Sequence, residues 1–177
     1  MVAGDLYRVI DMVLLSICLP TYNRKKALQQ VVDQLLVHIQ GYNDIEICIS
    51  DNHSVDGTSL SLIGYKTFKN NVKININDKN IGYDLNLVKV LRMATGKYCW
   101  TIGDDDLINK EAIDNLMIIL KSGEFSLGLM NAGDDQEMAD LESHFTAGVY
   151  SHSGIKNNLE TEYLEYLNSV QYNPSAF

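Results

Sequence analysis

Three consecutive carboxylates, Asp104, Asp105 and Asp106, are the residues of this sequence best suited to chemistry. Adjacent carboxylates repel one another, and this raises their pKa values unless a positive group compensates. A hard divalent cation such as Mg²⁺ or Mn²⁺ compensates well, because it prefers carboxylate oxygens together with substrate phosphate oxygens. The segment therefore predicts a metal site. A solvated turn that starts a helix is the open alternative, since acidic residues favour helix starts.

Three other polar segments could bind a ligand. Residues 21–24 offer an aromatic ring and a cation near a predicted helix start, a favourable place for an anion, although Tyr22 could equally be a structural aromatic and Arg24 a solvated first-turn residue. In the loop 51–58, Asp51 could accept a hydrogen bond from a base ring N–H, although these residue types also make ordinary turns. Gly82, in the segment 80–83, could let a ligand approach the backbone, or simply turn the chain before a helix.

Five short apolar runs predict the strands that must position these residues. The runs are Val13–Leu19, Ile45–Ser50, Val72–Asn77, Tyr98–Ile102 and Phe125–Met130. The segments between them have helical periodicity, clearest at residues 27–39, 85–94 and 113–120. Asn23 and Asn109 are the predicted N-caps of the first and last of these helices. Strands that alternate with helices predict an α/β fold whose sheet is mainly parallel and flanked by helices on both faces.

The polar segments directly follow predicted strands, at the points where the strands end. Residues 20–24 follow the first strand, 51–58 the second and 103–106 the fourth. Parallel sheets bind ligands at the carboxyl ends of their strands, near the point where the strand order reverses. We therefore expect these segments to meet in one site.

Composition narrows the class of protein. The chain has 177 residues, of which 46% are hydrophobic and 21% charged, as in a soluble globular domain. The net charge of −9 argues against a nucleic-acid binder. The longest apolar stretch, near residues 12–20, is too short to span a bilayer and lacks a leader cleavage signal, so a cytoplasmic location is expected. The three cysteines lie in apolar runs, which predicts buried free thiols.

Five motifs in order resemble the large family-two glycosyltransferases, which have the Rossmann-like GT-A fold. The matching segments are Ser16–Arg24, Asp51–Thr58, Asn80–Tyr83, Ala94–Tyr98 and Gly103–Ile108. Each motif is weak alone, but their order and spacing together are specific. The Gly-Asp-Asp-Asp variant is most similar to the abequosyltransferase-like branch, whose enzymes assemble bacterial surface polysaccharides such as O-antigen or capsule.

The resemblance implies a role for each matching position. It places the sugar donor against Pro20, Thr21, Tyr22, Arg24, Asp51, Asn52, Gly82 and Asp104. Asp51 matches the carboxylate that reads a pyrimidine ring N–H, which implies a UDP-linked or dTDP-linked sugar. The cofactor implied is Mn²⁺ or Mg²⁺, held by Asp105 with contributions from Asp104 and Asp106. The division among the three is open, because Gly103 replaces the first Asp of the commoner Asp-x-Asp-Asp motif.

The reaction implied is an inverting, metal-dependent transfer of a sugar to a saccharide or lipid-linked saccharide. The family's general base is usually an Asp well beyond the metal motif, and no segment here clearly matches it. Asp134 and Asp135 are weak candidates, with a flexible acidic loop as the alternative. We therefore expect donor binding with little transfer, from a piece of a longer protein or a donor domain without its acceptor half. A lipid-linked acceptor would bring peripheral contact with the cytoplasmic face of the inner membrane.

The sequence divides into three regions. Residues 1–12 are predicted to be an N-terminal appendage and 13–130 the donor-binding domain. Residues 131–177 carry one basic side chain against eight acidic ones, and are predicted to be a partial acceptor-side segment with a loop or irregular lobe at 131–150 and one amphipathic helix near 159–167. Two other functions remain open: a non-catalytic nucleotide-sugar-binding domain and a sugar nucleotidyltransferase. The latter would need a glycine-rich loop after the first strand, where residues 20–24 contain no glycine.

Overall fold

The computed structural model describes residues 12–68, 71–123, 127–131 and 145–151. In chain order the elements are β1 (Leu15–Thr21), α1 (Lys25–His38), β2 (Ile45–Asp51), α2 (Thr58–Phe68), β3 (Val72–Ile76), α3 (Tyr83–Met93), β4 (Tyr98–Thr101), α4 (Lys110–Ser122), β5 (Leu127–Asn131) and β6 (Phe145–Ser151). The strands form one sheet in the order β3-β2-β1-β4-β6-β5. The first four are parallel, β6 runs antiparallel to β4, and β5 runs antiparallel to β6.

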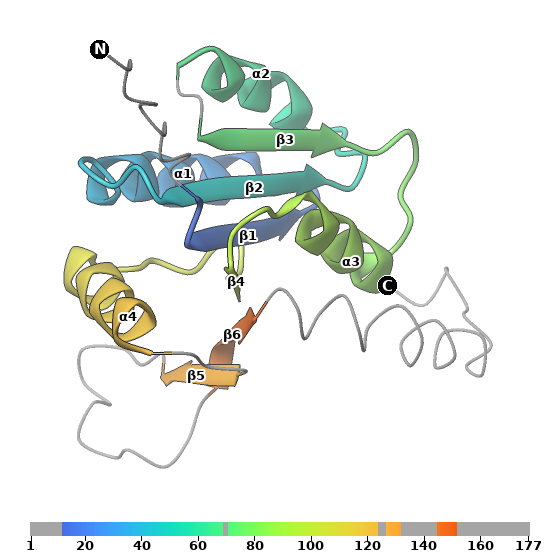
Figure 1. The fold of residues 1–177 in the computed structure, drawn as a ribbon. Helices are drawn as coiled ribbons and strands as arrows, with labels where there is room; N and C mark the ends of the chain where they lie inside the picture. Colours follow the sequence, from blue (N-terminus) through green and yellow to red (C-terminus); the bar gives the residue numbers. More distant parts are fainter. Residues whose placement is uncertain (1–11, 69–70, 124–126, 132–144, 152–177) are drawn as a thin grey trace, which may run out of the picture.

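The two faces of the sheet carry different side chains, because successive residues of a strand point to opposite sides. Leu15, Ile17 and Leu19 of β1 belong to the larger core, together with buried residues of α1, α2 and α4. Cys18 points the other way and joins a smaller core with Cys48, Cys99 and α3. Figure 1 shows the same division, with α1 behind the sheet and α3 in front of it. The predicted sheet with helices on both faces is confirmed, and the three cysteines are buried and free as expected.

The predicted strands all form, with ends shifted by at most two residues. The interpretation of 131–150 as a loop or irregular lobe was wrong at its end, because β6 begins at residue 145 and pairs with β4. The sheet therefore runs past the predicted boundary at residue 131. Residues 1–11, 132–144 and 152–177, with the predicted appendage and amphipathic helix, lie outside the described residues.

One of the two predicted N-caps is confirmed and the other is wrong. The side chain of Asn109 accepts a hydrogen bond from the Ala112 N–H at the start of α4. Asn23 instead has a left-handed backbone, with φ of 53°, and its side chain accepts from the Val55 N–H. Asn23 thus joins two loops, and the N-cap position of α1 falls to Arg24, whose side chain makes no capping hydrogen bond.

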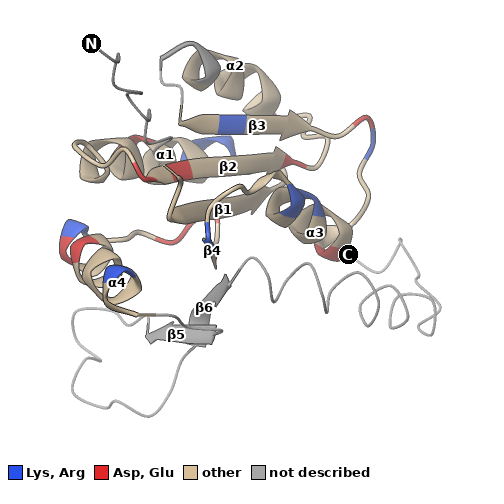
Figure 2. Cartoon of the chain, in the orientation of Figure 1, with Lys and Arg blue, Asp and Glu red and all other residues tan. Residues whose placement is uncertain are grey.

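A buried polar cluster lies on the α3 face of the sheet, at the end opposite to the strand carboxyl ends. The Glu46 carboxylate accepts hydrogen bonds from the Ser16 hydroxyl at 2.7 Å and the Thr95 N–H at 2.7 Å. It also pairs with the Lys73 ammonium at 2.7 Å, an ion pair that joins β2 to β3. Figure 2 shows acidic positions on β2 and a basic position on the neighbouring β3. Burial by itself raises the pKa of Glu46, but the hydrogen bonds from Lys73, Ser16 and Thr95 outweigh burial and leave this pKa below its ordinary value.

Gly96 lies beside this cluster, where the chain enters β4. A methyl group there would lie 2.7 Å from the Ser16 hydroxyl oxygen and 2.8 Å from the Ser16 backbone nitrogen. We expect Gly96→Ala to lower the free energy of unfolding by about 1–3 kcal/mol, because the backbone of β1 must shift to make room. Urea denaturation would measure the change. Gly64→Ala in α2, where the added methyl meets nothing within 4 Å, is the matched control and should not destabilise.

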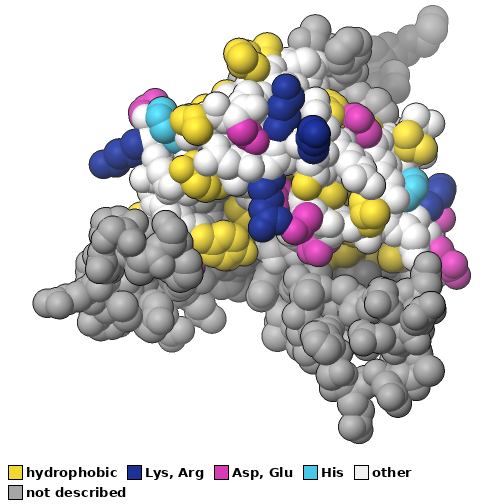
Figure 3. Space-filling model, turned by 180° about the vertical axis from the view of Figure 1, so that it is seen from behind, with side chains coloured by type: hydrophobic (Ala, Val, Ile, Leu, Met, Phe, Trp, Pro, Cys, Tyr) yellow, Lys and Arg dark blue, Asp and Glu magenta, His cyan; other side chains and the backbone are white. Residues whose placement is uncertain are grey.

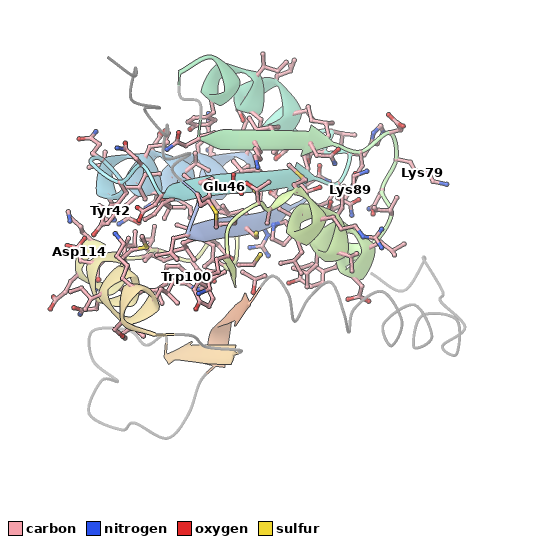
Figure 4. The ribbon with its side chains drawn as sticks, in the orientation of Figure 1. Tyr42, Glu46, Lys79, Lys89, Trp100 and Asp114 are labelled. Carbon is pink, nitrogen blue, oxygen red and sulfur yellow. The ribbon has the colours of Figure 1, made fainter. Side chains whose placement is uncertain are left out.

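On the larger-core side, α4 is fixed by polar contacts at its solvent edge. The Tyr42 hydroxyl donates to the Asp114 carboxylate at 2.7 Å, and the two residues lie side by side in Figure 4. Lys121 of α4 pairs with Asp44 at 2.9 Å. These contacts hold α4 against the loop between α1 and β2. The helix that follows the Asp104–Asp106 turn is therefore tied to the rest of the fold at both of its ends.

The surface of the described part shows neither a membrane segment nor a uniform charge. No helix among the described residues combines the length and the apolar character needed to cross a bilayer. On the face seen from behind in Figure 3, basic and acidic side chains are scattered among hydrophobic ones. Among the residues described, this face carries no continuous basic surface of the kind that binds nucleic acid.

Candidate active site

The candidate site is built where three neighbouring parallel strands end. Thr21, the last residue of β1, is in register with Asp51, the last residue of β2. On the other side of β1, the pairing with β4 reaches Cys18, and the Ile102 N–H then donates to the Cys18 carbonyl. The loop that follows β4 therefore emerges next to the end of β1. The expectation that these segments meet at one edge of the sheet is confirmed.

Asp104 is the most buried of the three consecutive carboxylates, with 8% of its surface exposed. Its carboxylate accepts a 2.6 Å hydrogen bond from the Thr21 hydroxyl, across 83 residues of sequence. The Arg24 Nε lies 3.8 Å from the other oxygen of Asp104. Burial raises the pKa of Asp104 above its ordinary value, the neighbouring Asp105 adds to this, and Thr21 and Arg24 oppose it. A positive ligand beside this carboxylate would lower its pKa and favour the charged form.

Asp105 and Asp106 point to different partners. The Asp105 carboxylate is half-exposed and forms an ion pair with the Arg24 guanidinium. The Asp106 carboxylate folds back and accepts a 2.7 Å hydrogen bond from the Gly103 N–H, which stabilises the turn. Within the described part of the chain, no group of three His, Cys, Asp or Glu side chains is arranged to hold a metal ion.

Two of the three carboxylates nevertheless face the same positively charged side chain, that of Arg24. Asp104 and Asp105 both approach Arg24, so their oxygens are directed toward the same positive group. Mg²⁺ in phosphate-binding sites commonly uses one or two protein carboxylates, with water and substrate oxygens completing its shell. The pair formed by Asp104 and Asp105 could therefore hold a divalent cation, whereas the Asp106 carboxylate stabilises the turn.

Asp51 is fully buried at the end of β2, where its carboxylate accepts hydrogen bonds from the Ser54 and Ser59 hydroxyls and, at 3.3 Å, from the Ser54 N–H. These contacts fix the carboxylate in place within the loop. Tyr22 lies one residue beyond β1, and 43% of its surface is exposed. Pro20, by contrast, is buried inside β1.

The loops after β1 and β2 are joined directly. The Asn23 N–H donates to the Ser54 hydroxyl at 2.7 Å, and the Lys25 N–H at the start of α1 donates to the Asp56 carboxylate at 3.0 Å. Asp56 thus caps α1 from a different part of the chain. A side chain on either loop is consequently held relative to the other, as a preorganised binding site requires.

The sequence of this chain is similar to those of known proteins. Residues 16–159 match the model of the family described as glycosyl transferase family 2. The chain belongs to this family. Among curated relatives, an abequosyltransferase of Salmonella typhimurium is 38% identical over 113 residues, which are 62% of this chain and 33% of the relative. A poly(ribitol-phosphate) β-N-acetylglucosaminyltransferase of Staphylococcus aureus is 29% identical over 103 residues, or 57% of this chain and 31% of the relative.

Solved structures place this glycosyl transferase family 2 chain in the GT-A fold. TarS of Staphylococcus aureus in complex with UDP superposes with a TM-score of 0.65 at 23% identity, covering 82% of this chain and 48% of TarS. A mannosyltransferase of Pyrobaculum calidifontis in complex with GDP-Man and Mn²⁺ has a TM-score of 0.68 at 15% identity, covering 80% and 45%. The chain spans about a third of the length of the curated relatives. The predicted family and fold are confirmed.

A network of buried amides also supports the site of this family 2 chain, and the sequence did not reveal it. Asn52 uses all four of its hydrogen-bonding positions. Its Nδ2 donates to the Asn80 side chain at 2.8 Å and to the Gly82 carbonyl at 3.1 Å, and its Oδ1 accepts from the Asn77 side chain at 3.2 Å and the Ile81 N–H at 2.9 Å. These bonds favour a positioning role over direct contact with a ligand.

The network extends into α3 through Asn86. The Asn86 Oδ1 accepts from the Ser50 hydroxyl at 2.8 Å and the Asn77 side chain at 2.9 Å, and its Nδ2 donates to the Ser50 carbonyl at 2.8 Å. Gly82 has φ of 82°, a conformation that suits glycine, and begins α3. Asn86, which lies inside the segment 85–94 predicted to be helical and is buried in the structure, was the signal that could have revealed the network, because a buried amide must find partners.

We expect Asn52→Ala to release the loop that carries Gly82. The substitution leaves the Ile81 N–H and the Gly82 carbonyl without their side-chain partner, so local opening becomes easier by about 1–3 kcal/mol. Hydrogen exchange of the Ile81 amide should therefore be about 10 to 100 times faster. Exchange in the core of β1 should change much less, and an equal acceleration throughout the chain would contradict a local role for Asn52.

The structure thus brings together most of the predicted site residues of the family 2 chain. Thr21, Arg24, Asp104 and Asp105 are in mutual contact, and Asp51 lies beside Thr21 in register. Gly82 reaches this edge only through Asn52. The candidate bases Asp134 and Asp135 lie outside the described residues.

Proposed function

We propose that this chain binds a pyrimidine nucleoside diphosphate sugar together with Mn²⁺ or Mg²⁺, as the donor-binding part of an inverting glycosyltransferase. The observation that carries the proposal is the convergence of Asp104 and Asp105 on one positive group, beside Thr21 at the junction of β1 and β4. Ligands of parallel α/β sheets bind at such junctions. Complexes of TarS with UDP and of the mannosyltransferase with GDP-Man and Mn²⁺ support a donor and a metal in proteins of this fold.

The residues of the site have separate proposed roles. Asp104 and Asp105 hold the cation, and Thr21 fixes Asp104 through its 2.6 Å hydrogen bond. When bound, the cation supplies positive charge that stabilises the diphosphate as it leaves the sugar. Asp51, held by Ser54 and Ser59, accepts the ring N–H of the base, and the accessible ring of Tyr22 stacks on the base.

The proposed acceptor is a saccharide or lipid-linked saccharide used in surface polysaccharide synthesis, because the abequosyltransferase relative is 38% identical over the matched region. A lipid-linked acceptor would place the reaction at the cytoplasmic face of the inner membrane. Inversion requires a general base on the acceptor side of the sugar. Thr21, Asp104 and Asp105 belong to the proposed donor side, and Asp134 and Asp135 are the proposed bases.

Titration calorimetry with UDP tests the proposal. We expect UDP to bind in the presence of Mn²⁺, with affinity lost when a chelator removes the metal. GDP should bind more weakly than UDP, because a guanine ring does not present the same N–H to Asp51. If neither UDP nor dTDP binds with metal present, the donor site is not real. Equal affinity for UDP and GDP would refute the proposed recognition of the base by Asp51, but not the donor site itself.

A further inference from the structure

The side chain of Arg24 occupies the place where a divalent cation would act. Its Nη1 pairs with Asp105, and its Nε lies 3.8 Å from Asp104. These are the two carboxylates to which we assign the metal. A guanidinium and a metal ion cannot lie between the same carboxylate oxygens at once. Binding of a cation must therefore displace the side chain of Arg24.

The backbone of Arg24 is fixed, whereas its side chain is accessible. The Arg24 carbonyl accepts from the Leu28 N–H at 2.9 Å, and the neighbouring Asn23 is bonded to Ser54. The Arg24 side chain is 52% exposed and contacts the carboxylates of Asp104 and Asp105. A displaced guanidinium would consequently stay near the start of α1, next to the cation, where it can reach the oxygens of a diphosphate. Arginine suits such oxygens because its planar fork donates two parallel hydrogen bonds.

We propose that Arg24 is the exchangeable counter-cation of the Asp104–Asp105 pair, which leaves the carboxylates for the donor diphosphate when a divalent cation binds. This inference rests on the proposed function. It assigns Arg24 two successive positions. Before binding, Arg24 neutralises the carboxylates. After binding, the metal neutralises them and Arg24 adds charge to the diphosphate, so that metal and donor favour each other's binding by the same factor.

The exchange predicts effects of opposite sign in a single variant. Arg24→Met keeps most of the apolar stem and removes the charge. Without its competitor, Mn²⁺ alone should bind about threefold more tightly, as expected for the loss of an exposed ion pair. UDP in saturating Mn²⁺ should bind about tenfold more weakly, because a charge-assisted contact to the diphosphate is lost. Uridine, which has no phosphate, should bind Arg24→Met and the parent chain equally.

The experiment uses the full 177-residue chain, with water-proton relaxation for Mn²⁺ alone and calorimetry for UDP and uridine. Lys26→Ala is the matched control, since Lys26 is an exposed cation in the first turn of α1 outside the proposed site. It should change none of the three affinities. Arg24→Lys keeps the charge but not the fork, and should restore competition with Mn²⁺ more fully than affinity for UDP. Equal melting temperatures would establish that the variants fold alike, and Arg24→Gln replaces Arg24→Met if they differ.

The possible outcomes separate this inference from the proposed function. If UDP binds the parent chain with Mn²⁺ but Arg24→Met leaves both the metal and UDP affinities unchanged, the exchange is refuted and the donor site stands. Weaker binding of Mn²⁺ alone by Arg24→Met would also refute it, because Arg24 would then assist the metal. If the parent chain binds no UDP with Mn²⁺, both proposals fall.

Discussion

Replacing Asp105 with alanine is expected to reduce the affinity for UDP in the presence of Mn²⁺ by about 100-fold. Asp105 is one of the two carboxylates that face the proposed cation position, and its half-exposed side chain pairs with Arg24. Losing one of two charged ligands should cost the metal, and the diphosphate bound to it, about 2–3 kcal/mol. The affinity for UDP without metal should barely change. Calorimetry with and without a chelator measures both quantities.

Asp106→Asn is the matched control for this substitution. The Asp106 carboxylate accepts the Gly103 N–H, and an asparagine can accept the same hydrogen bond. We therefore expect Asp106→Asn to retain most of the metal-dependent affinity. A loss as large as that of Asp105→Ala would show that Asp106 is a metal ligand and that its contact with Gly103 breaks on binding. If Asp105→Ala keeps the full affinity for UDP in the presence of Mn²⁺, Asp104 is the main metal ligand.

Replacing Glu46 with alanine is expected to lower the free energy of unfolding by about 3–5 kcal/mol, a large part of the stability of a domain of this size. The substitution removes the carboxylate partner of the Lys73 ammonium and the acceptor for the buried Ser16 hydroxyl and the Thr95 N–H. Urea denaturation at pH 7 measures this loss. Ser16 of β1 and Thr95, just before β4, lie where β4 joins the sheet. The substitution should therefore destabilise the whole fold, and the complete unfolding transition should move to a lower urea concentration.

The same carboxylate gives stability a specific dependence on pH. The pKa of Glu46 in the fold lies below the ordinary value of 4.5, so its contribution is fully present above that value and is lost as the pH falls through the lowered pKa. The difference in stability between the parent chain and Glu46→Gln should therefore be constant from pH 7 to about 5 and shrink below about 4. A difference that does not vary with pH would contradict an ionised Glu46 in the folded chain.

The strands and the place of the site could be predicted because both follow from local patterns. Apolar runs form β1 and β2, and polar residues directly after them must lie at the carboxyl edge of a parallel sheet. Strand β6 escaped prediction, since Phe145–Ser151 contains a glycine and small residues between acidic segments and lacks a clear alternation. Its pairing with β4 depends on tertiary contacts that a local pattern does not contain.

The partners of individual side chains could not be predicted for a different reason. Asn52 and Asn77 have the composition of an ordinary turn, and only the approach of the loops at the ends of β2 and β3 makes them a network. Asn23 was expected to cap α1, but the capping carboxylate is that of Asp56, 31 residues beyond Lys25, whose N–H it accepts. The ion pairs of Arg24 could not be predicted either, because Asp104 and Asp105 lie beside it only once β4 pairs with β1. Such contacts depend on which strands become neighbours.

The hydrogen bond between Thr21 and Asp104 has a consequence for how the chain acquires its site during synthesis. β1 pairs with β4 at the centre of the sheet, although β2 and β3 are made between them. Closing a loop of this length is entropically costly and makes such pairings slow to form. A nascent chain that has produced β1, β2 and β3 can begin to pair those strands, yet it has no place for a cation until β4 inserts. Affinity for the proposed donor would therefore arise late in synthesis, and donor binding would then selectively stabilise chains in which the central strand is in place.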